Sequence, residues 1–150
     1  FLPTLWEKQA PWEKPVPPPV SQVMEQMWFT GAHSDVGGGY AETGLSDVTL
    51  EWMVGRAETL GGLEFERWAL ELQPDPLAKV HDSFDAFFKM LHWATGNGGG
   101  TMRVFNQYPT SVTCEDIHPS VLARAAQHPR ENWPPSFAAE IKRRLASPAE

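Results

Sequence analysis

A buried strand that runs into a glycine-rich turn constrains this fold more than any other feature of the sequence. The run V-M-E-Q-M-W-F-T, from Val23 to Thr30, is dense in apolar and aromatic residues and stops at Gly31. Its length and composition predict a strand that ends at a loop. The loop that follows, G-A-H-S-D-V-G-G-G-Y, ends at Tyr40 and contains three consecutive glycines.

A helix is predicted after this loop. Ser46 can cap its first free N–H groups, and Asp47 suits the positive end of its dipole. The pair Gly61-Gly62 favours a left-handed end. Apolar residues at helical spacing predict one buried face, formed by Leu50, Met53, Val54, Ala57 and Leu60. Strand, loop and helix together indicate the C-terminal half of a βα unit, so we expect an α/β fold.

Weaker patterns organise the rest of the chain. Residues 1–20 hold six prolines and two tryptophans. Because proline removes backbone donors and fixes φ, residues 1–22 are predicted to form an extended arm, and residues 23–150 the remaining domain. Further predicted elements are a short strand within 63–72, a helix over 83–93, a short strand at 102–106, a helix starting at 116–119 and a last helix over 137–145.

Composition argues against several classes of protein. The net charge of −7 disfavours a nucleic-acid partner, because such proteins neutralise phosphates. No apolar window approaches the roughly 20 residues of a membrane span, and no signal peptide is visible. The single cysteine, Cys114, excludes an intrachain disulfide, suits a reducing compartment and is expected to be a small buried hydrophobe. Phe1 is not methionine, which indicates a chain cut or processed from a longer one.

His33 follows the predicted strand at the place where α/β folds position functional groups. A neutral imidazole can accept a proton near physiological pH. The glycines at 37–39 would let the backbone approach a ligand closely or take positive φ. Spacing alone leaves open that His33 is an ordinary turn residue and that the glycines only serve a tight loop. A phosphate loop is disfavoured because the lysine and Ser/Thr of its motif are absent.

Several segments stand out together: Q-M-W-F-T-G-A-H-S-D-V-G-G-G-Y, L-S-D-V-T-L-E-W-M at 45–53, His81-Asp82-Ser83, and I-H-P-S-V-L-A-R at 117–124. They resemble the catalytic domain of the type VI secretion phospholipase-effector-like α/β-hydrolases, over roughly residues 23–124. The resemblance implies that this chain is the C-terminal part of an α/β-hydrolase-like domain. That part would hold the final strand, the catalytic-histidine loop and covering helices, with loop-rich extensions.

The resemblance also implies a Ser–Asp–His triad in that chain order, with His33 as its last member. None of the serines lies in a G-x-S-x-G turn, and none of the acids before His33, which are Glu7, Glu13 and Glu25, follows a recognisable strand. The nucleophile and the acid are therefore expected upstream, in a missing N-terminal part of the domain. The implied reaction is hydrolysis of carboxylic esters, in phospholipids or other lipids, without a cofactor. Transient contact with a membrane surface fits such a substrate. The location is expected to be cytoplasmic, or outside the cell after export without a cleavable signal peptide.

Other residues near His33 are assigned supporting roles. The site loop is expected to be supported by Gly31, Ser34, Asp35, Gly37, Gly38 and Gly39, with Asp35 accepting backbone N–H bonds. Candidates for stabilising nearby loops or helix starts are His81, Asp82 and His118. No H-x-x-x-H or C-x-x-C spacing supports a metal site. Tyr40 and Trp28 are expected to be packing residues.

A second class of function stays open at this stage. The chain could be a non-catalytic interaction fragment, a hydrolase remnant that binds a partner. The tryptophans of the arm, Trp6 and Trp12, motivate this alternative, because aromatic side chains commonly anchor interfaces.

Overall fold

The chain divides into two compact units, in a computed structural model that describes residues 23–82, 105 and 113–146. Unit 2, residues 29–102, lies in sequence between the two segments of unit 1, residues 1–28 and 103–150. The predicted arm, the predicted helix over 83–93 and, apart from Phe105, the predicted strand at 102–106 fall outside the described residues.

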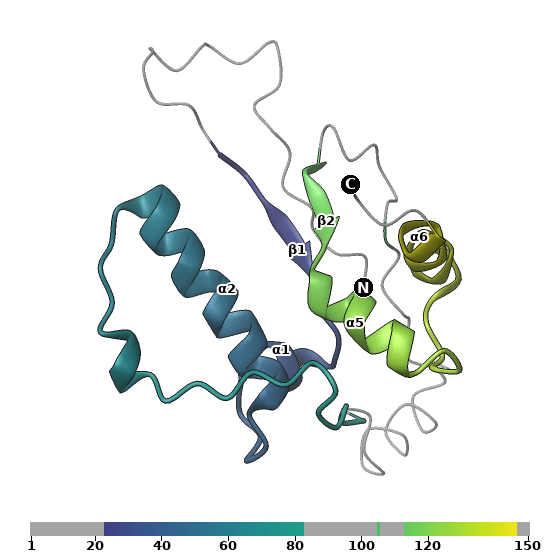
Figure 1. The fold of residues 1–150 in the computed structure, drawn as a ribbon, viewed down its shortest axis with the longest axis horizontal. Helices are drawn as coiled ribbons and strands as arrows, with labels where there is room; N and C mark the ends of the chain where they lie inside the picture. Colours follow the sequence, from purple (N-terminus) through teal and green to yellow (C-terminus); the bar gives the residue numbers. More distant parts are fainter. Residues whose placement is uncertain (1–22, 83–104, 106–112, 147–150) are drawn as a thin grey trace, which may run out of the picture. The chain divides into compact units, whose positions relative to one another are not determined.

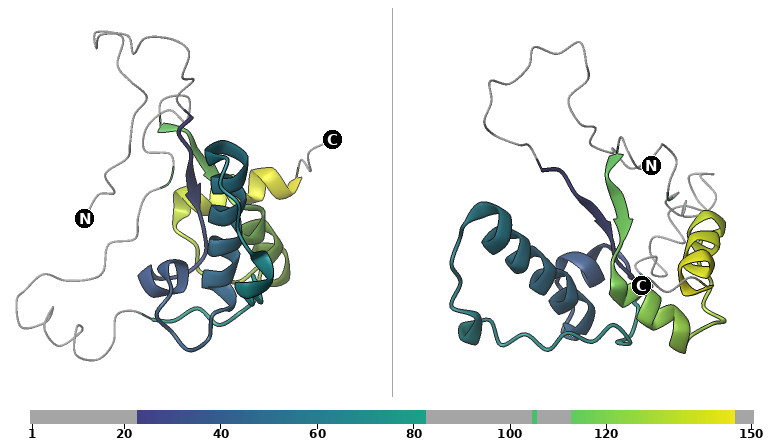
Figure 2. Two further views of the ribbon diagram at one scale, coloured as in Figure 1. Left: turned by 90° about the vertical axis from the view of Figure 1, so that its left-hand side faces the viewer. Right: turned by 45° about the horizontal axis from the view of Figure 1, so that its top comes forward.

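Unit 1 is built on two parallel strands, β1 (Gln26–Trp28) and β2 (Glu115–Ile117), which lie side by side in Figures 1 and 2. The register pairs Gln26 with Glu115 and Trp28 with Ile117. Parallel neighbours need a long crossover connection, which the inserted unit 2 forms part of. The parallel pair with its helices confirms the mixed α/β class, although β1 covers only three residues of the predicted strand at 23–30.

Two helices complete the described part of unit 1, α5 (Pro119–Gln127) and α6 (Pro135–Ala146). Both were predicted, but β2 occupies the expected start of α5 at 116–117, so α5 begins at Pro119. His118 is its N-cap, and its Nδ1 accepts from the Ser120 backbone N–H at 3.3 Å. Pro119 stands in the first turn, where its missing N–H leaves no hydrogen bond unmade.

The core of unit 1 joins one strand to both helices. Its buried members are Phe105, Ile117, Val121, Ala125, Phe137 and Ile141. The Phe137 ring lies 5.4 Å from that of Phe105 and 5.9 Å from that of Trp28, measured between centroids. Trp28 is therefore a packing residue, as predicted. Cys114 is only partly buried and has a positive φ of 54°, so the prediction of a buried cysteine was wrong.

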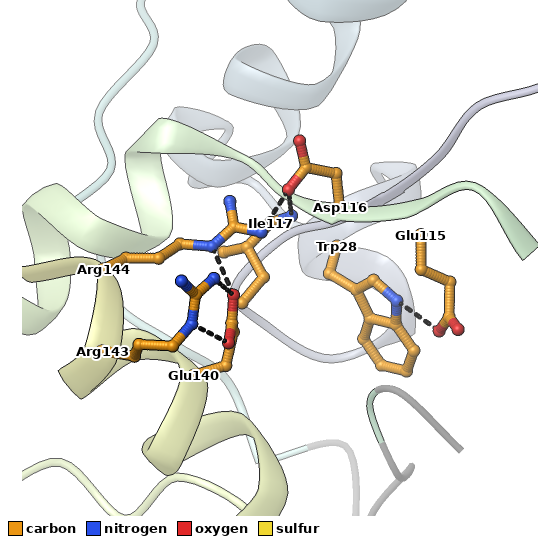
Figure 3. Close-up of polar contacts among 7 residues, drawn as sticks. All are labelled: Trp28, Glu115, Asp116, Ile117, Glu140, Arg143 and Arg144. Atoms are coloured by element: carbon orange, nitrogen blue, oxygen red, sulfur yellow. Dashed lines mark hydrogen bonds and ion pairs between the residues drawn. The ribbon is translucent and has the colours of Figure 1, made fainter. Parts of the chain in front are cut away.

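Two polar clusters accompany this core (Figure 3). In the first, buried Glu115 accepts the Trp28 indole N–H at 3.0 Å and the Thr113 hydroxyl at 2.8 Å. Both carboxylate oxygens thus have a donor, which a buried carboxylate requires.

The second cluster is held by Glu140 on α6 (Figure 3). Glu140 accepts from Arg143 Nε and from Arg144 Nε, each at 2.8 Å. These contacts, the Arg143 hydrogen bond first among them, lower the pKa of Glu140 from 4.5 to about 2 against the opposing effect of burial. Arg144 also reaches the Asp116 carboxylate at 2.5 Å and so joins α6 to β2.

Unit 2 contains α1 (His33–Gly37), α2 (Gly44–Gly61) and the short 3-10 helix η1 (Arg67–Ala69). The main helix was predicted, but it starts earlier, with Thr43 as N-cap. Ser46 is no cap, because its hydroxyl donates to the Thr43 carbonyl at 2.9 Å.

The predicted glycine end of α2 is confirmed. Gly62 is left-handed, with φ 64°, and its N–H donates to the Glu58 carbonyl at 3.1 Å. The predicted apolar face was wrong in large part. Leu50, Met53 and Leu60 are exposed, while the buried apolar residues of α2 are Leu45, Val48 and Val54.

The predicted strand within 63–72 was also wrong. This segment holds η1 and mostly exposed residues, and the chain then returns toward the start of α2 (Figure 1). There the Gln73 N–H donates to the Asp47 carboxylate and the Asp75 N–H donates to the Gly44 carbonyl, both at 3.0 Å. The backbone N–H groups of Gln73 and Asp75 thus bind the first turn of α2. None of the helices in the described parts is long and apolar enough to cross a membrane.

Candidate active site

The candidate site lies in unit 2, in the segment from Gly31 to Tyr40. We predicted an open loop here, but His33–Gly37 form the helix α1. Ala32 is its N-cap, and the Asp35 Oδ2 accepts the Ala32 N–H at 2.8 Å. This is the back-reaching half of a capping box, in which the third helical residue satisfies the N-cap amide. The carboxylate three residues after Ala32 was a sequence signal for a helix start, and the prediction missed it.

Gly31 is required by the close approach of Asp35. Its φ is +117°, and a Cβ placed on it would lie 2.4 Å from the Asp35 Cβ. The other glycines differ among themselves. Gly38 and Gly39 have positive φ, of 83° and 129°, whereas Gly37 does not, and its Cβ would meet open space. The backbone therefore requires glycine at Gly31, Gly38 and Gly39, where φ is positive, but not at Gly37.

Asp35 and His81 form the best-defined polar contact of the site, although they are 46 positions apart. His81 Nδ1 lies 2.7 Å from Asp35 Oδ1, and the His81 backbone N–H donates to Asp35 Oδ2 at 3.1 Å. The Asp35 side chain is 2% exposed and that of His81 is 14% exposed. A buried carboxylate thus binds the imidazole and fixes its orientation, as acids do for catalytic histidines.

Two further side chains surround His81. The Tyr40 ring stacks on the imidazole, with centroids 3.9 Å apart and planes 22° from parallel, so the predicted packing role of Tyr40 holds. The Glu42 carboxylate lies 3.4 Å from His81 Nε2 and is 64% exposed. One edge and one face of the imidazole are therefore enclosed, and the Nε2 edge opens toward an exposed side chain.

His33 itself is the first residue of α1 and is exposed. Among the described residues its imidazole makes no hydrogen bond or ion pair. Its neighbour Ser34 is partly buried, with its Oγ 3.7 Å from where a Gly39 Cβ would stand. The Thr30 hydroxyl, just before Gly31, is buried and has no hydrogen-bond partner in the described part of the chain.

The structure therefore brings Gly31, Asp35 and His81 together, with Tyr40 and Glu42 beside them. Asp82 follows His81 in the chain and is exposed. His118 belongs to unit 1, where it caps α5.

No group of three or more His, Cys, Asp and Glu side chains is arranged so that it could hold a metal ion in residues 23–82, 105 and 113–146. A hollow of about 260 Å³ in unit 2 is lined by Glu51, Val54, Arg67, Trp68, Leu70, Glu71 and Leu72. None of these residues belongs to the 31–40 segment, so this hollow is separate from the candidate site.

Comparison with known proteins supplies the remaining observations. Uncharacterized protein YEL023C of Saccharomyces cerevisiae is 36% identical over 72 residues, which cover 45% of this chain and 10% of the yeast protein. The chain thus spans about a tenth of the length of this curated relative. No solved structure matches the chain.

A family model matches residues 1–56. The match includes the proline-rich segment, β1, Asp35 and His33, and ends within α2, ahead of His81 and the segment at 117–124. The resemblance seen in the sequence is thereby confirmed for its first and longest block. The matching model describes the catalytic domain of T6SS, phospholipase effector Tle1-like proteins, and residues 1–56 are similar to that domain.

Proposed function

We propose that this chain supplies the histidine of a serine-hydrolase site that cleaves carboxylic esters in phospholipids or other lipids. One observation carries this proposal. His33 lies within the matched residues 1–56, in the first turn of α1 and two residues after Gly31, and its imidazole is exposed. An exposed imidazole can be reached by a serine and an ester, and the turn before it is held by a buried carboxylate.

The chemistry assigned to His33 is proton transfer. As the serine oxygen attacks the ester carbonyl carbon, the imidazole accepts the hydroxyl proton, and it then gives that proton to the departing alkoxide. Water repeats the sequence on the acyl-enzyme and regenerates the serine. No serine here lies in a G-x-S-x-G turn, and no acid before His33 follows a strand that the sequence predicts. The nucleophile, the acid and the oxyanion hole would therefore come from outside these 150 residues.

The lipid substrate is the part of the proposal that rests on the family description alone. Transient contact with a membrane surface would follow from it. The division of the chain into an arm, 1–22, and a hydrolase portion, 23–150, is likewise proposed here. The family match crosses that boundary, so the arm is included in the matched sequence.

The test is an esterase and phospholipase assay of this chain together with an N-terminal hydrolase fragment that carries a G-x-S-x-G serine. Replacing His33 with Ala should lower kcat by about 10³-fold or more, as loss of a triad histidine does. His128→Ala is the matched control, because His128 is an exposed histidine of unit 1. Turnover that survives His33→Ala, with a folded protein, would remove His33 from the reaction.

An interaction module is the second candidate function. It is favoured by exposed apolar side chains of unit 2, namely Leu50, Met53, Leu60, Leu63 and Trp68, the last of them 80% exposed. Exposed apolar side chains mark a contact site where they lie together on the surface. The partner proposed is the N-terminal part of the same domain. Binding of that fragment without ester turnover, abolished by Trp68→Ser, would favour this function over catalysis.

A further inference from the structure

We infer that Asp35 and His81 act as a positioning couple, in which His81 locks the Asp35 carboxylate and Asp35 holds the turn that carries His33. The importance of this couple for catalysis rests on the proposed role of His33. The contact between Asp35 and His81 and its effect on the turn do not depend on that role. Neither residue is given contact with substrate. The inference follows from three features of the contact.

The first feature is the number of donors on one buried carboxylate. Asp35 Oδ2 accepts the backbone N–H groups of Ala32 and His81, at 2.8 and 3.1 Å, and Oδ1 is 2.7 Å from the His81 imidazole. A carboxylate that is 2% exposed needs such partners, because burying it unpaired is costly. Two of its three donors belong to His81, and of these two the imidazole is the one that a substitution at residue 81 can remove.

The second feature is the tautomer of His81. An ionised carboxylate only accepts hydrogen bonds, so in the inferred couple the imidazole carries a proton on Nδ1. Tyr40 stacks on the ring and fixes its plane. His81 is therefore held as an Nδ1–H donor aimed at Asp35.

The third feature is how Asp35 bears on His33. The Asp35 oxygen binds the N–H of Ala32, the residue directly before His33 and the N-cap of α1. Helix α1 has only five residues, a length at which a helix has little stability of its own. Gly31 adds a steric restraint, since it packs against the Asp35 Cβ with no room for a side chain. The backbone from 31 to 33 thus follows the position of Asp35.

The first experiment uses the uniformly ¹⁵N-labelled full chain and measures amide hydrogen exchange at Ala32. His81→Asn keeps an N–H donor near the place of Nδ1, whereas His81→Gln and His81→Ala do not. We expect exchange at Ala32 to rise by roughly ten- to hundredfold in the Gln and Ala variants, and to stay near the wild-type rate in His81→Asn. His128→Gln, at an exposed histidine of unit 1, should change nothing at Ala32.

Equal exchange at Ala32 in wild type and His81→Ala would overturn the inference. Exchange at Ala32 that is as fast in His81→Asn as in His81→Ala would also overturn it. If His81 only filled space, the donor that Asn retains would not slow exchange at Ala32.

The second experiment reads the tautomer from imidazole ¹⁵N spectra. The wild-type spectrum should show His81 with a hydrogen-bonded Nδ1 proton. Asp35→Asn can present its amide N–H to His81, which should then move the proton to Nε2. A wild-type spectrum with the proton on Nε2 alone would contradict the inference. Neither experiment involves ester turnover, so their failure leaves the proposed role of His33 standing.

Where turnover is measured with the N-terminal fragment, the same variants separate the two ideas. His81→Ala should lower kcat with little change in KM, and His81→Asn should recover most of the loss. Loss on His33→Ala without loss on His81→Ala would retain the proposed function and reject the positioning couple.

Discussion

Replacing Gly31 with Ala tests whether the turn before His33 is built as described. Two penalties add at this position. A φ of +117° is strained for any residue with a side chain, which costs about 1–3 kcal/mol. The new Cβ would stand 2.4 Å from the Asp35 Cβ, and relieving such an overlap by shifting neighbours costs about 1–3 kcal/mol more. We expect a total destabilisation of about 2–6 kcal/mol.

The measurement is urea unfolding followed by far-ultraviolet circular dichroism, with Gly37→Ala as the matched control. Gly37 stands six residues on in the same segment, its added Cβ meets nothing within 4 Å, and its φ is not positive. Alanine there should be neutral or stabilise by about 0.4–1 kcal/mol, because it restricts the unfolded chain. If the two variants have the same stability within about 0.5 kcal/mol, the reasoning about Gly31 is wrong.

A double-mutant comparison in the Asp35→Gly variant separates the cost of the strained φ at residue 31 from the cost of the overlap with the Asp35 Cβ. Asp35→Gly removes the Cβ that a residue at 31 would strike, so Gly31→Ala in that background should cost only the strain of its φ. A coupling between the two positions of about 1–3 kcal/mol is the expected result. Strict additivity would mean that the overlap is relaxed in some other way.

Two predictions concern unit 1. Glu115→Ala should destabilise the chain by about 2–6 kcal/mol in urea unfolding, because the Trp28 indole and the Thr113 hydroxyl each lose their acceptor at a cost of about 1–3 kcal/mol. Glu115→Gln keeps one carbonyl oxygen and should cost clearly less. Equal destabilisation by the two variants would count against this role of Glu115. The pKa of Glu140 is lowered from 4.5 to about 2 in the folded chain, so its contribution to stability is present above about pH 5 and lost as the pH falls toward 2. Unfolding free energies measured across that range should fall less steeply for Glu140→Gln, and an unchanged slope would contradict the assignment.

The sequence predicts those features of the fold that depend on residues close together in the chain. The helix α2, its left-handed end at Gly62, and the helices α5 and α6 all have local signals, in caps, glycines and prolines. The start of α1 also has one, in Asp35, but the three glycines that follow favour a loop.

What could not be predicted depends on contacts between distant segments. No spacing rule links Asp35 to His81, 46 positions away, so the two residues were assigned supporting roles without any indication that they bind each other. The exposed face of α2 is a similar case. Helical periodicity shows that Leu50, Met53 and Leu60 share a side, but which side is covered depends on what else the chain places there.

The insertion of unit 2 between the paired strands has a consequence for the order in which the chain can acquire structure. Trp28 and Glu115, which hydrogen-bond across β1 and β2, are 87 positions apart, so closing that pair carries the entropy of a long loop. Unit 2 is continuous in sequence, and its contact between Asp35 and His81 joins two residues that both precede β2 in the chain. Because a ribosome synthesises the chain from its N-terminus, the Asp35–His81 contact can form before β2, the partner strand of β1, has been made.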